Sequence, residues 1–254
     1  MLRTFSVYMN SFNEDRNIRV YLPKSYPRGE VRYPVLYMHD GQNVFRDADA
    51  IGGISLSLED YLEKKDLEVI VVSIDQNSEE RVNEYCPWIN GKYSEKILGY
   101  QCNLGGKGPK YVDFIIDELK PFIDNKYRTI EDRTSIGGIS LGGLISIYAA
   151  CRYPQIFKKV IAISPAFWRN QEEIEELIKN SDLSPIESVY LDWGDKEGKD
   201  ERINRVFSDS NKAVFEILKA KNTNVKGKII NGGEHSYEFF KERVPEIFTF
   251  LQNS

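Results

Sequence analysis

The stretch Thr134–Gly143, with the sequence TSIGGISLGG, changes character halfway, and this change decides the fold. Its first part, Thr134–Ile139, is a short and largely apolar run of the kind that forms a buried strand. After Ser140 the apolar residues recur at helical spacing, at Leu144, Ile147 and Cys151. The sequence therefore predicts a strand, a sharp turn at Ser140 and a helix.

Ser140 lies in the pattern G-x-S-x-G, with Gly138 before it and Gly142 after it. A turn this tight strains the serine backbone, and side chains two residues to either side would clash with it. A strand, this pattern and a helix in that order are typical of a nucleophile elbow. The pattern alone also occurs in ordinary turns, so the flanking strand and helix support the prediction that Ser140 is a nucleophile. Free N–H groups at the start of the helix, at Leu141, would face a developing oxyanion.

Other short, continuously apolar runs alternate with helical patterns along the chain. They cover Pro34–Met38, Leu67–Ile74, Lys159–Ile163, Ser188–Leu191 and Gly227–Ile230. Strands buried on both faces of a parallel sheet have such sequences. Helical spacing is expected over 111–124, Glu172–Lys179, Asn211–Lys219 and Phe239–Leu251, the last kinked at Pro245. We expect an α/β fold, a mostly parallel central sheet with helices on both faces.

Two segments fall outside this alternation. At the N-terminus, Thr4–Met9 and Asn17–Leu22 have strand periodicity, which predicts an antiparallel hairpin. Between about 76 and 109 no periodicity is clear, whereas Gly, Pro, Asn and aromatic residues are frequent. A connection this long is usually functional or disordered, and its aromatic content favours an ordered pocket wall. We expect residues 1–254 to form a single α/β domain that carries this loop insertion.

The composition excludes several classes of function. Two histidines and three unevenly spaced cysteines without a CxxC pair argue against a structural metal site. With 34 basic and 39 acidic residues the net charge is −5, which gives no sign of binding to nucleic acid or an anionic membrane. The nucleotide-binding patterns G-x-x-x-x-G-K-[ST] and G-x-G-x-x-G after a strand are both absent from the sequence. We expect a small-molecule ligand, no metal or organic cofactor, and no nucleic-acid or membrane partner; the oligomeric state stays open.

The first twenty residues contain no apolar stretch long enough for a secretory signal. The longest apolar runs also fall far short of the roughly 18 residues that span a bilayer. These features predict a cytoplasmic protein.

A serine hydroxyl needs a positioned base, and histidine is the usual choice because its pKa lies near neutrality. In α/β hydrolases the order along the chain is serine, acid, histidine. His235 lies 95 residues after Ser140, in a loop that follows the last predicted strand, whereas His39 precedes the serine. Chain order therefore favours His235 as the base, with a surface loop residue as the alternative, and gives His39 a structural role.

Four carboxylates follow the strand predicted at Ser188–Leu191, and any one of them could orient the histidine. They are Asp192, Asp195, Glu197 and Asp200. Asp192 is expected at the end of the strand, and the other three are expected in a loop that can reach His235. The residues alone do not choose among these carboxylates.

The segment from Met38 to Asn43, MHDGQN, follows another apolar strand, at the place from which α/β hydrolases supply a second oxyanion N–H. Gly41 would allow close approach of the backbone to a tetrahedral intermediate. Ligands of such sheets bind at the carboxyl ends of the strands. Three tryptophans follow predicted strands and could line a pocket there, with ordinary packing as the alternative: Trp88, Trp168 and Trp193.

Several motifs taken together resemble one family. They are Tyr37–Phe45, Arg81 with Glu84 and Tyr85, Gly105–Gly108 before the helix at 111–124, Gly137–Gly143, Ser164–Trp168 and Gly233–Ser236. They resemble the esterase branch of the α/β hydrolases, which includes enterochelin esterase-like proteins, feruloyl and acetylxylan esterases, S-formylglutathione hydrolase and mycolyltransferases. The motifs span most of the chain and are specific for the fold and its catalytic machinery, not for the substrate.

The resemblance implies roles for particular residues. The acid would be Glu197, three residues after Gly194, with Asp195 close by as the alternative. Oxyanion amides would come from Leu141 and from Gly41 or Gln42, and the segment with Arg81, Tyr85 and Trp88 would face the acyl or alcohol group. It thus implies a serine esterase that forms an acyl-enzyme. The alternatives are an acyltransferase with the same triad and a non-catalytic binding protein of the same fold.

Overall fold

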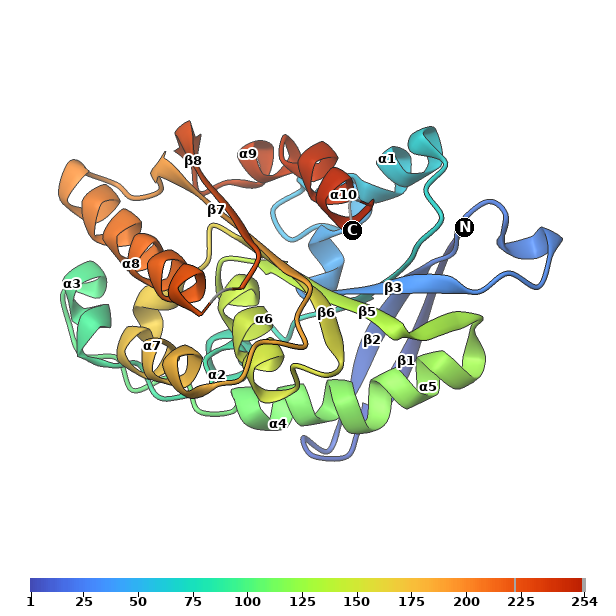
Figure 1. Ribbon diagram of the computed structural model, residues 1–254, viewed down its shortest axis with the longest axis horizontal. Coiled ribbons are helices and arrows are strands. Elements are labelled where there is room, and N and C mark those ends of the chain that lie inside the picture. Colours follow the sequence, from blue (N-terminus) through green and yellow to red (C-terminus); the bar gives the residue numbers. More distant parts are fainter. Residues whose placement is uncertain (222, 253–254) are drawn as a thin grey trace.

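The computed structural model describes residues 1–221 and 223–252, and within these ranges one sheet of eight strands crosses the molecule (Figure 1). Its strands are β1 (Leu2–Met9), β2 (Glu14–Tyr21), β3 (Tyr33–Met38), β4 (Ile70–Ile74), β5 (Thr129–Ile139), β6 (Phe157–Ile163), β7 (Ser188–Lys196) and β8 (Val225–Glu234). They lie in the order β1-β2-β4-β3-β5-β6-β7-β8. Strands β1 and β2 form an antiparallel hairpin, β2 pairs antiparallel with β4, and the remaining pairs are parallel. The predicted fold class is confirmed.

Helices cover both faces of the sheet. They are α1 (Leu58–Lys65), α2 (Arg81–Tyr85), α3 (Glu95–Leu98), α4 (Gly108–Asp113), α5 (Lys120–Lys126), α6 (Leu141–Arg152), α7 (Gln171–Asn180), α8 (Glu201–Ala220), α9 (Tyr237–Lys241) and α10 (Val244–Gln252). In Figure 1, α1, α9 and α10 lie above the sheet, and α4 to α8 lie below it. A π-helical stretch, Phe114–Leu119, joins α4 to α5 into one rod.

The central strands β3, β4 and β6 are apolar at successive positions because both of their faces are buried. In β3, Val35 and Tyr37 belong to the core below the sheet, whereas Leu36 and Met38 belong to the core shared with α1 and α10. Side chains of a strand alternate between faces, so burying both faces requires apolar residues at successive positions. The run Gly227–Ile230, which was expected to be such a strand, lies in the edge strand β8 and is largely exposed. Because β3, β5, β6, β7 and β8 pair parallel, their carboxyl ends lie along one edge of the sheet.

The helix expected over Phe239–Leu251 is interrupted. Helix α9 ends at Lys241 and α10 begins at Val244, with Pro245 as its second residue. Proline is tolerated in a first helical turn because the N–H that it lacks would have no partner inside the helix. The break leaves Arg243 in a turn between the two helices.

The insertion at about 76–109 is folded. It contains α2, α3 and a bridge between Ile89 and Gly105, and it packs on the neighbouring helices. The Asn170 side chain donates to the carbonyl groups of Trp88 and Ile89, and the hydroxyl of Tyr93 donates to the carbonyl of Val206 in α8. Across the described ranges, no helix combines the length and apolar character needed to cross a bilayer.

Candidate active site

Ser140 occupies the turn between β5 and α6 with an unusual backbone, φ 59° and ψ −118°. A side chain on Gly138 would place its Cβ 2.6 Å from the carbonyl carbon of Gly142, which explains the glycine at position 138. The Ser140 N–H donates to the carbonyl of Ile163 in β6 and ties the turn to the sheet. The sequence thus folds locally as expected, with the hydroxyl at the carboxyl edge of the sheet.

His235 follows β8 and reaches the serine. Its Nε2 lies 3.0 Å from Ser140 Oγ, and its Nδ1 lies 2.6 Å from Glu197 Oε2. A carboxylate only accepts hydrogen bonds, so Nδ1 donates to it and Nε2 of the neutral ring accepts the serine proton. The rings of Phe207 and Phe240 contact the imidazole edge-on, at centroid distances of 5.8 and 5.2 Å. These contacts hold one orientation of the ring.

The structure gives each of the four carboxylates after Leu191 a different partner. Asp192 is fully buried in β7 and bonds Tyr190 and Arg243. Asp195 accepts from the N–H of Gly232, and Asp200 caps α8 by accepting from the N–H of Ile203. Among these four, Glu197 is the one whose carboxylate bonds His235.

Glu197 is held as an anion. Burial would raise the pKa of its carboxyl, but the hydrogen bond and charge of His235 and the bonds from Ser164 and the Gly194 N–H lower that pKa overall. Its side chain has no exposed surface, whereas the side chain of His235 is 32% exposed. The imidazole of His235 thus contacts the Glu197 carboxylate through Nδ1 and the Ser140 hydroxyl through Nε2, and it is partly exposed to solvent.

A loop after β3 lies beside this group and is held by an ion pair. Asp40 has a positive φ of 57°, and its carboxylate accepts two hydrogen bonds from Arg81, at 2.6 and 2.8 Å. The N–H of Asp40 donates to the hydroxyl of Tyr85. The Gln42 side chain bonds both main-chain groups of Gln76. The loop is therefore fixed from two sides.

Gly41 lies in the loop after β3, and Leu141 is the first residue of α6. A Cβ on Gly41 would lie 2.4 Å from an Asp75 oxygen, so the loop runs too close to its neighbour for any side chain. Helix α6 begins at Leu141, and the first N–H groups of a helix have no partner inside it. Gly142 lies under the same loop, because its Cβ would sit 3.3 Å from Cβ of His39.

His39 is enclosed by aromatic rings. It is 2% exposed, its Nδ1 lies 2.9 Å from the hydroxyl of Tyr111, and its ring packs on Tyr85 and Tyr111. Burial lowers its pKa to about 4, so the ring is neutral at pH 7. This is the structural environment that the sequence predicts for His39.

The residues expected to contact a ligand differ in how far their side chains are exposed. Tyr85 is fully buried and supports Asp40, and Trp193 is 3% exposed with its Nε1 donating to Ser208 of α8. Arg81 is engaged by Asp40 and keeps a quarter of its side chain exposed. Trp88 is half-buried against Tyr148, and Trp168 is nearly buried under Arg169. In this structure, Tyr85 and Trp193 pack inside the protein instead of lining an open surface.

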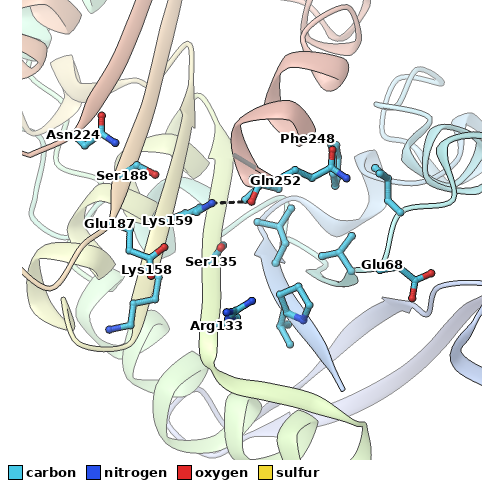
Figure 2. Close-up of a pocket in the computed structure, with 16 residues that line it drawn as sticks. Glu68, Arg133, Ser135, Lys158, Lys159, Glu187, Ser188, Asn224, Phe248 and Gln252 are labelled. Atoms are coloured by element: carbon cyan, nitrogen blue, oxygen red, sulfur yellow. Dashed lines mark hydrogen bonds between the residues drawn. The ribbon is translucent and has the colours of Figure 1, made fainter. Parts of the chain in front are cut away.

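A large cavity lies away from Ser140 and His235. It has a volume of about 810 Å³ and lies at the amino ends of β3, β5, β6 and β7, next to the end of α10. Figure 2 shows its lining, in which the ammonium group of Lys159 donates to the carbonyl of Leu251. Ser140 and His235 do not line it. Nor do three or more His, Cys, Asp or Glu side chains gather as a metal site would need, anywhere in residues 1–221 and 223–252.

Two residues behind Glu197 were not singled out as site residues by the sequence analysis. Ser164 donates to Glu197, and Arg243 donates to Ser164. Ser164 belongs to one of the quoted motifs, which is a signal for its importance, whereas nothing in the sequence marks Arg243.

Comparison with known proteins places this chain in a family. The sequence model of the family described as "Putative esterase" matches residues 9–251. The uncharacterized protein YbbA of Bacillus subtilis is 29% identical over 89% of this chain and 88% of its own length. The ferri-bacillibactin esterase BesA of the same organism is 28% identical over 64% of this chain and 58% of its own length.

Among solved structures, an IroE-like serine hydrolase from Shewanella oneidensis superposes with a TM-score of 0.80. It is 19% identical, and the match covers 98% of this chain and 80% of that one. At this identity the likeness concerns the fold. The family match covers nearly the whole chain and confirms the resemblance seen in the motifs: this chain belongs to the esterase family of the α/β hydrolases.

Proposed function

We propose that this chain is a serine esterase whose nucleophile, base and acid are Ser140, His235 and Glu197. The observation that carries the proposal is the continuous contact from Ser140 Oγ to His235 Nε2 and from His235 Nδ1 to Glu197 Oε2. Hydroxyl, imidazole and carboxylate in this order are the parts that acyl transfer through a serine requires. The family membership of the chain supports the same reaction class.

In the proposed reaction, His235 Nε2 takes the proton of Ser140 as Oγ attacks the ester carbonyl carbon. The carbonyl oxygen becomes an oxyanion, which the N–H groups of Leu141 and of Gly41 or Gln42 stabilise. Collapse of the intermediate expels the alcohol, which receives the proton from His235. Water then attacks the acyl-enzyme, again with His235 as the base, and the acid is released as Ser140 Oγ takes that proton back from His235. Glu197 stabilises the imidazolium in each half of the reaction.

The fixed loop after β3 supports the oxyanion role. Donors stabilise a transition state most when they need no rearrangement during the reaction. The Asp40–Arg81 ion pair and the bonds of Gln42 to Gln76 hold Gly41 in place before any ligand arrives. For Arg81 and Tyr85 we therefore propose support of this loop, in place of the direct substrate contact that the family resemblance implies.

The proposed substrate is a small-molecule carboxylic ester. The relative BesA is named a ferri-bacillibactin esterase, which makes siderophore esters the first class to test. We propose that the insertion at about 76–109 forms one wall of the substrate site in a single domain of residues 1–254. The proposed lining consists of half-buried Trp88, whose carbonyl accepts from the Asn170 side chain, and nearly buried Trp168.

The test combines active-site labelling with an ester panel. A fluorophosphonate should label one serine per chain, and Ser140→Ala should abolish both the labelling and the hydrolysis of short-chain, aryl and siderophore-type esters. No labelling and no turnover on the panel would reject the esterase proposal in favour of a binding protein. Product analysis with added alcohol acceptors separates hydrolysis from acyl transfer, because a transferase forms a new ester in place of the free acid.

A further inference from the structure

A buried polar cluster lies directly behind Glu197, on the side away from His235. Ser164 follows β6, Asp192 lies in β7, and Arg243 comes from the turn between α9 and α10. Asp192 and Ser164 are fully buried, and Arg243 is 4% exposed. The proposed mechanism uses none of the three, and burying charged groups costs stability unless each is well paired.

The hydrogen bonds of this cluster fix the direction of the Ser164 hydroxyl proton. Arg243 Nη1 donates to Ser164 Oγ at 2.7 Å, and a guanidinium cannot accept in return. The single hydroxyl proton of Ser164 is therefore free to donate onward, and it points to Glu197 Oε1 at 2.5 Å. The arginine thus determines the direction of the serine hydroxyl.

The two carboxylate oxygens of Glu197 therefore have different hydrogen-bond partners. Oε1 accepts from Ser164 and from the N–H of Gly194, both at 2.5 Å. Oε2 is left for Nδ1 of His235. A carboxylate held by two donors at one oxygen cannot rotate about its terminal bond without breaking both hydrogen bonds.

Arg243 also balances charge. It bonds Asp192 Oδ1 at 3.2 Å, and its Nη2 lies 4.0 Å from Glu197 Oε1, so one cation stands between two buried carboxylates. Tyr190 donates to the other oxygen of Asp192. The guanidinium also lies over the ring of Phe240, which contacts His235 edge-on. The segment after His235 therefore returns to support the residues that orient it.

We propose that Arg243, acting through Ser164, is a positioning residue that holds the Glu197 carboxylate with Oε2 facing His235. The inference rests on the proposed function, since it concerns how the acid of that triad is oriented. The arginine touches neither the nucleophile nor the imidazole, so its effect passes through the two oxygens of Glu197.

Two changes separate positioning from simple charge balance. Ser164→Ala removes the bridging hydroxyl and leaves both charges of the Arg243–Asp192 pair. The double variant Arg243→Met with Asp192→Asn removes that pair as a unit, so that no uncompensated charge stays buried. A matched control is Arg16→Met with Glu84→Gln, which removes another buried ion pair, one that does not touch Glu197.

The first readout is kinetic, on the best ester of the panel. Both Ser164→Ala and the double variant should lower kcat by about 10- to 100-fold, with a much smaller change in KM. Ser164→Ala removes a hydrogen bond to the acid, and the double variant removes the guanidinium that directs the Ser164 hydroxyl to it. Arg243→Lys keeps the cation and should retain more activity than the double variant. A loss of fold alone would reduce the amount of active enzyme that fluorophosphonate titrates and would leave kcat per active site unchanged.

The second readout does not need a substrate. The Nδ1 proton that His235 shares with Glu197 should give a far-downfield proton NMR signal, which His235→Ala assigns in a chain with two histidines. The signal should shift or broaden in Ser164→Ala and in the double variant, and it should persist in the Arg16/Glu84 control.

The outcomes of the two readouts are distinct. Parental kcat and an unchanged signal in the double variant would overturn the inference and reduce Arg243 to the partner of Asp192. If that variant does not fold, the same results in Ser164→Ala would overturn it. An inactive, unlabelled parent that still shows the signal and its loss in these variants would overturn the esterase proposal and leave the positioning contact in place.

Discussion

The surroundings of His39 and of His235 differ although both residues follow the carboxyl end of a strand of the same sheet. His39 follows β3 and is 2% exposed, with Tyr111 on its Nδ1. His235 follows β8, with Glu197 on its Nδ1 and Ser140 on its Nε2. A phenol cannot stabilise an imidazolium as an anionic carboxylate can. Both residues are histidines, so the residue type does not distinguish them. The hydrogen-bond partners of the ring and its access to solvent are what suit His235, and not His39, to proton transfer.

Burial makes the difference electrostatic as well as geometric. It lowers the pKa of His39 to about 4, which keeps that ring neutral over the whole range in which hydrolases usually work. Its neighbours are the rings of Tyr85 and Tyr111 and the loop that carries Asp40. His39 therefore supports the loop after β3, whereas His235 has the partners and the access that proton transfer needs.

The largest effect is expected from the open histidine. Replacing His235 with alanine removes the proposed base, and kcat/KM should fall by about 10⁴- to 10⁶-fold, since removal of a triad histidine has such effects elsewhere. The measurement is ester hydrolysis normalised to folded protein, with the melting temperature as the control. Retention of most of the activity would break the contrast, because His39 would then have to act as a base from a closed environment.

A smaller loss is expected from the carboxylate behind it. Glu197→Gln keeps the shape of the side chain and removes its charge, so kcat should fall by about 10²- to 10⁴-fold. Asp195→Asn is the matched control, because Asp195 bonds the N–H of Gly232 and not the imidazole. Its effect should stay below about tenfold. The opposite ranking of the two variants would assign the acid to Asp195.

These positions also show how far the sequence could predict the structure. The central strands were predictable because burial on both faces leaves a continuous apolar run, as Val35 to Met38 illustrate. Ser140 and His235 were predictable as a contact because one motif and the chain order leave few choices. Glu197 needed the family resemblance, since four nearby carboxylates look alike until the fold brings one of them to the imidazole.

Other features depend on contacts that a sequence does not display. Trp193 was expected after a strand, but β7 extends to Lys196, and alternation along that strand directs Trp193 to α8 and Asp192 to Arg243. Helices α1, α2 and α3 have eight, five and four residues, too few to establish a helical period. Arg243 meets Glu197 across 46 residues of chain, and no local pattern encodes that meeting.

The pH dependence of protein stability should reveal the lowered pKa of buried His39. The pKa of His39 falls from 6.5 when unfolded to about 4 when folded, so between these values the unfolded chain binds the additional proton. The free energy of unfolding therefore decreases as the pH falls through this window, by about 3 kcal/mol from this group. His39→Gln lacks the effect, so its deficit relative to the parent at pH 7.5 should shrink by about 2–3 kcal/mol near pH 4.5. Urea unfolding at a series of pH values measures the deficit, and a constant or growing deficit would contradict a buried, neutral His39.

The smallest expected effect concerns the partner of that histidine. The neutral ring needs a donor or an acceptor at Nδ1, and the hydroxyl of Tyr111 lies 2.9 Å away in a site without solvent contact. Tyr111→Phe leaves Nδ1 unpaired and should lower the free energy of unfolding by about 1–2 kcal/mol. In a double-mutant cycle with His39→Phe, the two changes should couple by about 1 kcal/mol, because removing both partners leaves no orphaned polar group. A coupling energy near zero would mean that the hydrogen bond between His39 and Tyr111 contributes nothing to the stability of the protein. The enclosure by Tyr85 and Tyr111 alone would then distinguish His39 from His235.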